Sequence, residues 1–209
     1  MPNFCIGGVL FETSGNGLLQ KISLHHLCDT IEIPCTTPYG ETISSIGRDC
    51  FKRSGSCNKL ILPPTVSVVH KDAFYDSAVK EVVWSSGCST IPKGCFYNSL
   101  IERISNIDHV AVIGDFAFTS SCIKDFVWPN KCRTIPTGCF SNSKLESISN
   151  ICHVLEISAL AFESLKYTGK LNLSEIIFCR VDQRAFRHTP KNNIIFPYYI
   201  SEEELNSFE

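Results

Sequence analysis

The spacing of phenylalanine constrains the fold of this chain more than any other feature of its sequence. Seven phenylalanines recur at steps of 23, 22, 22, 22, 22 and 24 residues: Phe51, Phe74, Phe96, Phe118, Phe140, Phe162 and Phe186. A small residue, Ala or Cys, directly precedes each one, and an Ile or Val lies five residues before it. A fixed period in the twenties is typical of a solenoid, whose units bury their apolar faces by stacking on one another. We therefore expect these phenylalanines to form a ladder through the core.

Each unit also carries a short apolar run upstream of its phenylalanine, as at 60–62, 82–84 and 126–128. Such runs predict one strand per unit. The later Ile-x-x-x-(Ala/Cys)-Phe segment spaces its apolar residues at i, i+4 and i+5, which fits one face of a single helical turn. The predicted fold is a leucine-rich-repeat solenoid, mostly β with short helical or 3-10 turns. It would be a single right-handed stack, curved or flat, with one parallel β-sheet.

A longer period overlies the short one. Residues 84–118 and 128–162 align without a gap and are identical at twenty of thirty-five positions. Two repeat types therefore alternate, and duplication of a pair of units is the simplest account.

The unit resembles the BspA-type leucine-rich repeats, with the consensus L-x-x-I-x-(I/L)-P-x-x-V-x-x-I-x-x-x-A-F. Here it reads Leu60-Ile61-Leu62-Pro63-Pro64-Thr65-Val66, then Val69 and Ala73-Phe74. The resemblance covers roughly residues 42–190 and implies an adhesin, a surface antigen or an interaction scaffold, and not an enzyme.

The chain is expected to divide into three parts. About seven repeats of ~22 residues occupy 42–190, with an N-terminal cap and a degenerate repeat in 1–41 and a C-terminal cap in 191–209. The N-terminal cap should contain a strand around Cys5–Glu12 and a weak unit over 22–34. The C-terminal cap should contain a strand over 194–196. A capping box at 201–204 should then open a short helix that includes Leu205 and Phe208.

Charge and hydropathy exclude some classes of partner. The formal net charge of −2 argues against a dedicated nucleic-acid binder. No apolar run reaches the ~18 residues that a membrane-spanning helix needs, so no membrane insertion is expected.

The start of the chain lacks the basic residues of a signal peptide. A cytoplasmic location is therefore favoured, and a cell-surface location, implied by the resemblance, is the alternative.

Repeat register explains five of the twelve cysteines. Cys50, Cys95 and Cys139 occupy the slot of Ala in other units, and Cys88 and Cys132 occupy that of Val, so we expect buried, reduced thiols. Cys88 and Cys132 should lie ~10 Å apart, too far for a disulfide. The other seven are less constrained, and disulfides among them stay open.

No catalytic or metal site is predicted. His109 and His153 are equivalent in register, but the same ~10 Å offset is too long for one zinc ion. Trp84 and Trp128 should be core residues, and Asn106 and Asn150 should satisfy backbone groups at the bends. Because no catalytic motif occurs either, we expect neither a cofactor nor enzymatic activity.

The outward side chains of the strands are the candidate binding residues. Period-two alternation places ten residues on the exposed sheet face: Lys59, Ile61, Glu81, Val83, Arg103, Ser105, Asp125, Val127, Ser147 and Ser149. Opposite charges on neighbouring strands would support the stack. The same face also suits a protein partner. The sequence thus predicts a non-catalytic protein–protein interaction module; the alternative is a cell-surface antigen or adhesin that binds host or matrix macromolecules. Partner identity and oligomeric state stay open.

Overall fold

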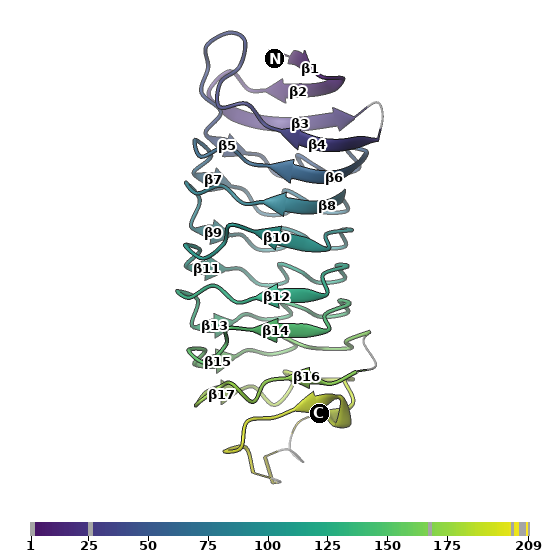
Figure 1. The fold of residues 1–209 in the computed structure, drawn as a ribbon, viewed down its shortest axis with the longest axis vertical. Helices are drawn as coiled ribbons and strands as arrows, with labels where there is room; N and C mark the ends of the chain where they lie inside the picture. The colour runs from purple at the N-terminus through teal and green to yellow at the C-terminus, as the bar shows by residue number, and fades with distance from the viewer. Residues whose placement is uncertain (1–2, 25–26, 167–168, 202, 205–207, 209) are drawn as a thin grey trace.

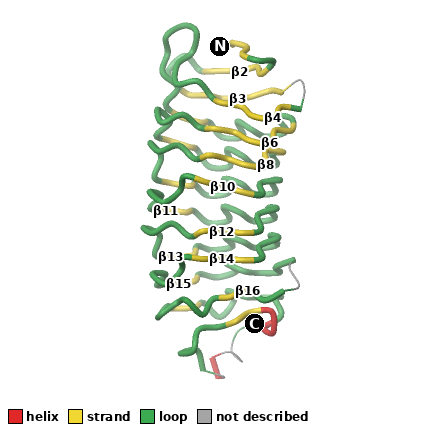
Figure 2. The backbone as a smooth tube through the Cα atoms, viewed as in Figure 1, coloured by secondary structure: helices red, strands yellow, loops and turns green. Residues whose placement is uncertain are grey.

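A computed structural model describes residues 3–24, 27–166, 169–201, 203–204 and 208. The chain winds into a tall stack of coils with its two ends at opposite ends of the stack (Figure 1). Strands and turns dominate, and short helical segments occur only near the C-terminus within the described residues, among them the 3-10 helix η1 (Lys191–Asn193) (Figure 2). The predicted solenoid is confirmed.

One strand per coil forms a front ladder of parallel strands. It starts after the N-terminal segment and continues to the last coil: β4 (Cys28–Glu32), β6 (Ser56–Ile61), β8 (Ala78–Val83), β10 (Arg103–Ser105), β12 (Asp125–Val127), β14 (Ser147–Ser149), β16 (Leu171–Asn172) and β18 (Ile194–Ile195). These are the strands that the apolar runs predicted. Parallel pairing joins β4 to β6, β6 to β8, β8 to β10, β12 to β14 and β16 to β18.

A second series of strands forms a rear ladder. After β3 (Leu18–Leu24), each member has only two residues: β5 (Ser45–Ile46), β7 (Val68–Val69), β9 (Thr90–Ile91), β11 (Val112–Ile113), β13 (Thr134–Ile135), β15 (Glu156–Ile157) and β17 (Arg180–Val181). The expectation of one parallel sheet with helical or 3-10 turns opposite it was wrong on both points. The Ile or Val that begins each (Ile/Val)-x-x-x-(Ala/Cys)-Phe segment lies in a rear strand, and the rest of the segment is a non-helical turn.

The N-terminal segment begins with a hairpin. β1 (Asn3–Ile6) and β2 (Val9–Thr13) pair antiparallel, so the single strand expected around Cys5–Glu12 was wrong. Gly7 and Gly8 lie between the two strands with φ of 56° and 80°, values that glycine adopts without steric cost. β2 pairs antiparallel with β3, and β3 then pairs parallel with β5. The hairpin therefore covers the first coil of the rear ladder.

The phenylalanine ladder lies in the turns that follow the rear strands. All seven rings are at most 1% exposed, and successive rings stack with centroids 4.2–5.8 Å apart. The backbone N–H of each of the first six donates to the carbonyl of the small residue in the next coil, as from Phe96 to Ala117 at 2.8 Å. These small residues are themselves fully buried, so a large side chain would not fit between the coils.

The last coil is covered by aromatic side chains. Phe208 is buried against Phe186 and Phe196, with centroids 5.7 and 5.9 Å apart. Ser201 and Glu204 form the expected capping box: the Ser201 N–H donates to Oε2 of Glu204 at 2.9 Å, and the Glu204 N–H donates to Oγ of Ser201 at 3.2 Å. The expected helix residue Leu205 lies outside the described residues.

Candidate functional site

The ten candidate side chains line the front ladder, and none of them is buried. Lys59, Glu81 and Arg103 are register partners on β6, β8 and β10, and Asp125 pairs with Ser147 across β12 and β14. They form one column of outward side chains, which we call the inner column: Lys59, Glu81, Arg103, Asp125 and Ser147. Its charge alternates from one coil to the next.

A second charged column runs beside the first. Lys80, Glu102, Lys124 and Glu146 directly precede the members of the inner column, and they too are outside the core. Two successive residues face outward because the strand interrupts its alternation there, as between buried Val79 and Val82 of β8. We call this second series the outer column. One open groove is lined by both columns together: Asn58, Lys80, Glu81, Glu102, Arg103, Lys124 and Asp125.

The two columns form a checkerboard of charge, which we call the charged face. Sign alternates along each column and also across each coil, as in Lys80-Glu81 and Glu102-Arg103. Sequence reasoning from strict period two missed the outer column. The recurrence of a charged residue every 22 positions from 80 to 146 was the signal that could have revealed it.

Only part of this charge is paired within the chain. Lys59 Nζ lies 3.0 Å from Oε1 of Glu81, and Lys124 Nζ lies 3.5 Å from Oε1 of Glu146. Ser147 Oγ donates to Oδ1 of Asp125 at 2.6 Å. Across the described ranges, three charges at the centre of the groove make no ion pair: Lys80, Glu102 and Arg103.

A partly apolar column borders the charges on the C-terminal side of each strand. From coil to coil this column contains Ile61, Val83, Ser105, Val127 and Ser149. Val127 is 57% exposed. The charged face thus adjoins aliphatic surface that a partner could bury.

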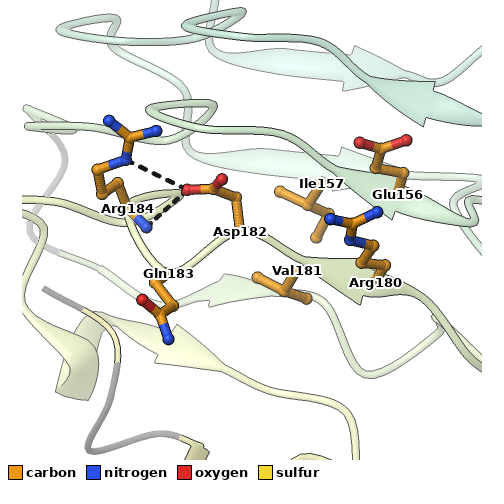
Figure 3. A pocket seen from close by; sticks show the side chains of 7 residues that line it. All are labelled: Glu156, Ile157, Arg180, Val181, Asp182, Gln183 and Arg184. Carbon is orange, nitrogen blue, oxygen red and sulfur yellow. Dashed lines mark hydrogen bonds and ion pairs between the residues drawn. The ribbon is translucent and has the colours of Figure 1, made fainter.

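The rear ladder differs in character. Its outward residues on successive strands are mostly Ser, Val and Thr, and charge appears only at Glu156 and Arg180, which are register partners. A groove there is shown in Figure 3 and is lined by Glu156, Ile157, Arg180, Val181, Asp182, Gln183 and Arg184. Arg184 is turned to Asp182, with its Nε 3.6 Å from Oδ1. No charge alternation extends from this groove along the stack.

The aromatic and amide residues singled out in the sequence have structural contacts. Trp84 and Trp128 are 0% exposed, and each Nε1 donates at 3.0 Å to the carbonyl of Cys88 or Cys132. Asn106 adopts φ 59° and donates through Nδ2 to the Trp84 carbonyl at 2.7 Å.

Asn150 repeats the Asn106 contact on the Trp128 carbonyl. His109 and His153 each place Nε2 within 3.0 Å of a backbone carbonyl, that of Ser85 or Pro129. Because Trp84 and Trp128 are fully buried, neither side chain is available to stack on a ligand.

All twelve cysteines are free thiols in this structure. The five assigned to core slots are buried, and burial raises the pKa of Cys132 to about 11 and those of Cys50, Cys95 and Cys139 further. Of the seven less constrained thiols, Cys57 and Cys179 are buried; Cys5, Cys35 and Cys152 are exposed; Cys28 and Cys122 are partly buried. The thiols of Cys50, Cys95, Cys132 and Cys139 are therefore held protonated and unreactive at neutral pH.

Neither a cluster of metal ligands nor a membrane-spanning helix occurs in the described part of the chain. No group of three or more His, Cys, Asp or Glu side chains there is arranged to hold a metal ion. No helix among these residues has the length and apolar character to cross a bilayer.

One solved structure shares this architecture, and two others are similar to the chain at lower TM-scores, all at low sequence identity. A leucine-rich repeat protein from Bacteroides ovatus superposes with a TM-score of 0.51 at 15% identity, over 87% of this chain and 54% of that protein. The chain thus spans about half the length of that relative. The T. pallidum leucine-rich repeat protein TpLRR gives 0.49 at 15% identity, over 66% of this chain and 72% of its own. The pneumococcal vaccine antigen PcpA gives 0.43 at 16% identity, over 90% and 47%.

No curated protein matches the chain. The model of the BspA-type leucine-rich repeat region, however, matches six copies over residues 44–168, which is more than half of the sequence. The chain belongs to the BspA-type leucine-rich-repeat family.

Proposed function

We propose that this chain is a non-catalytic protein-binding module that holds its partner on the charged face. The observation that carries the proposal is the double column of alternating charge, at whose centre Lys80, Glu102 and Arg103 have no ion-pair partner among the described residues. Charges that only supported the stack would be expected to pair with their neighbours. These three are free to pair with a partner instead.

The checkerboard also defines the chemistry of that partner. Strands lie ~4.8 Å apart, so charges of one sign recur every ~10 Å along each column. A polyanion such as nucleic acid would meet a carboxylate for every amino or guanidinium group and gain little. A protein surface that carries both signs at matching positions would gain from each contact, mainly in specificity and association rate. Ile61, Val83 and Val127 would supply apolar area beside those contacts.

A purely structural role for the charges is the competing interpretation. Lys59 and Glu81 do form a cross-strand ion pair at 3.0 Å. An exposed pair of this kind contributes ~0–1 kcal/mol. The two roles are separable because Glu102 and Arg103 can be exchanged without breaking any ion pair seen within the described residues.

The test compares two variants of equal net charge. The first, Glu102→Arg with Arg103→Glu, exchanges two signs in the middle of the charged face. The matched control, Glu156→Arg with Arg180→Glu, exchanges the two register partners of the rear ladder. Proteins retained from source lysate by the wild type are identified, and the affinity of each is then measured by calorimetry against all three chains.

The proposal expects at least a tenfold loss of affinity in the front variant, which corresponds to about 1.4 kcal/mol, and unchanged affinity in the rear control. The front variant places like charges on neighbouring strands, so urea unfolding should show a loss of up to about 1 kcal/mol for it and unchanged stability for the rear control; all three chains stay folded under the conditions of the affinity measurement. Equal affinity for all three would refute the charged face as the binding site.

A surface antigen or adhesin is the second candidate, and the family resemblance favours it. In that case the same charged face would bind a host or matrix macromolecule. Counting free thiols in protein taken directly from its source separates the candidates. A reducing cytoplasm would leave every thiol free, whereas an exported chain would show oxidised cysteines.

A further inference from the structure

Two cysteines face each other across the first two strands of the front ladder. Cys28 in β4 and Cys57 in β6 are direct register partners in a parallel pair. Neighbouring strands lie ~4.8 Å apart, and disulfides span Cα separations of ~4.4–6.8 Å. The two backbones are therefore already within bonding range.

Both side chains are on the core side of the strands. Cys57 is 1% exposed, and Cys28 is partly buried against the same core. On the outer side of the pair, Asn58 Nδ2 donates to Oδ1 of Asp29 at 3.0 Å and fixes the register one residue further along. Burial raises the pKa of Cys57, and the neighbouring Cys28 thiol raises it further. Register pairing on one side of the ladder places the two sulfurs in one local environment.

We propose that Cys28 and Cys57 are an oxidation site and form a disulfide that joins β4 to β6. No other pair among the twelve cysteines combines strand adjacency with access from solvent. The remaining core thiols recur in alternate coils, ~10 Å apart. Within one coil, Cys88 and Cys95 are both at most 2% exposed, as are Cys132 and Cys139, so an oxidant reaches neither pair.

The chemistry needs a low-molecular-weight disulfide as oxidant, for which oxidised glutathione is the probe. The Cys28 thiolate attacks one sulfur of the oxidant, which gives a mixed disulfide and releases one glutathione thiolate. The Cys57 thiolate then attacks Sγ of Cys28, forms the Sγ–Sγ bond and expels the second glutathione. The two released thiolates take up the two cysteine protons. Two thiols are thereby oxidised and one disulfide is reduced.

The bond would close a loop of 28 intervening residues. That loop includes β5 of the rear ladder and Thr30 and Glu32, which adjoin Lys59 and Ile61 at the start of the front face. A cross-link there removes conformational freedom from the unfolded chain and fixes the N-terminal end of the front ladder. Its effect is a thermal midpoint raised by roughly 5–10 °C.

The experiment oxidises the folded, full-length chain with glutathione disulfide and maps the products by non-reducing peptide mass spectrometry. We expect a peptide pair that links Cys28 to Cys57, together with the higher thermal midpoint, and both should reverse with dithiothreitol. Cys28→Ser should abolish the link and the rise. Cys35→Ser, which removes an exposed thiol of the same loop, should preserve both.

Oxidised wild type that carries only glutathione adducts, or that joins Cys28 to a different cysteine, would overturn the proposal. An equal rise of the midpoint in Cys28→Ser would overturn it as well. Because the map of the wild type decides the linkage by itself, the result stands even where a variant folds poorly. It is also independent of whether the charged face binds a partner.

Discussion

Truncation of Phe118 to alanine is the most direct test of the phenylalanine ladder. The ring is 0% exposed and occupies the centre of the stack. It stacks on Phe96 and Phe140 with centroids 5.4 and 5.6 Å apart and meets Phe126 edge-on at 5.0 Å. Its removal would therefore leave a void bounded on three sides by aromatic rings.

The magnitude follows from these contacts. A buried Phe→Ala change costs about 3–5 kcal/mol in transfer and cavity terms. Each aromatic pair adds about 0.5–1.5 kcal/mol beyond burial, and three pairs are lost. The adjacent coils are tied by the Phe118 N–H to Cys139 bond at 2.9 Å, which limits collapse into the void. We expect a loss near the upper limit, about 5 kcal/mol.

Urea unfolding followed by far-ultraviolet circular dichroism measures this loss, and the thermal midpoint should fall by about 10–20 °C. Phe178→Ala is the matched control because that ring is 70% exposed, so its loss should stay below about 0.5 kcal/mol. A cost below about 1 kcal/mol for Phe118→Ala would show that the ring does not carry the packing assigned to it.

Three further changes test the coil geometry and the buried thiols. Asn106→Ala should cost about 2–3 kcal/mol in urea unfolding, because it loses a hydrogen bond and retains φ 59°, whereas Asn106→Gly should cost about 1. Burial raises the pKa of Cys132 from 9.0 to about 11. The protonated buried thiol therefore contributes its full stabilisation below pH 9.0, and this stabilisation is lost as the pH rises to about 11. The thermal midpoint should fall over that pH range, and Cys132→Val should make the fall smaller. Gly138→Ala, whose Cβ would overlap the Phe116 ring, should destabilise more than Gly40→Ala, which meets open space.

The sequence was sufficient for the stack but not for its second ladder. The 22-residue period and the apolar runs predicted the front strands because a periodic core leaves a periodic signal. The rear strands have two residues each, too few to show alternation. Their Ile also satisfies the spacing of a helical turn, so local pattern alone favoured the wrong structure. In the N-terminal hairpin, Gly7 and Gly8 separate two strands within an apolar segment that the sequence predicted as one strand.

The candidate face was half predictable for a related reason. Period two correctly placed Arg103 and its inner-column neighbours outside the core. The same rule assigned Lys80 and Glu102 to the core side of the strands. The strands interrupt their alternation at these positions, and this interruption arises from the geometry of the coil, which residue type does not reveal. Register between coils, which brought Cys28 beside Cys57, was equally hidden: the two are separated by an irregular segment of the chain.

The two similar segments, 84–118 and 128–162, repeat several contacts with their neighbours. Trp84 and Trp128 make equivalent 3.0 Å bonds, and Asn106 and Asn150 equivalent 2.7 Å bonds. A coil therefore meets many of the same contacts on the correct neighbour and on one displaced by 44 residues. During folding this ambiguity permits a mispaired intermediate that must open before the stack completes. In evolution the same ambiguity permits unequal recombination to add or remove a pair of coils, so the length of the charged face can change without redesign of the core.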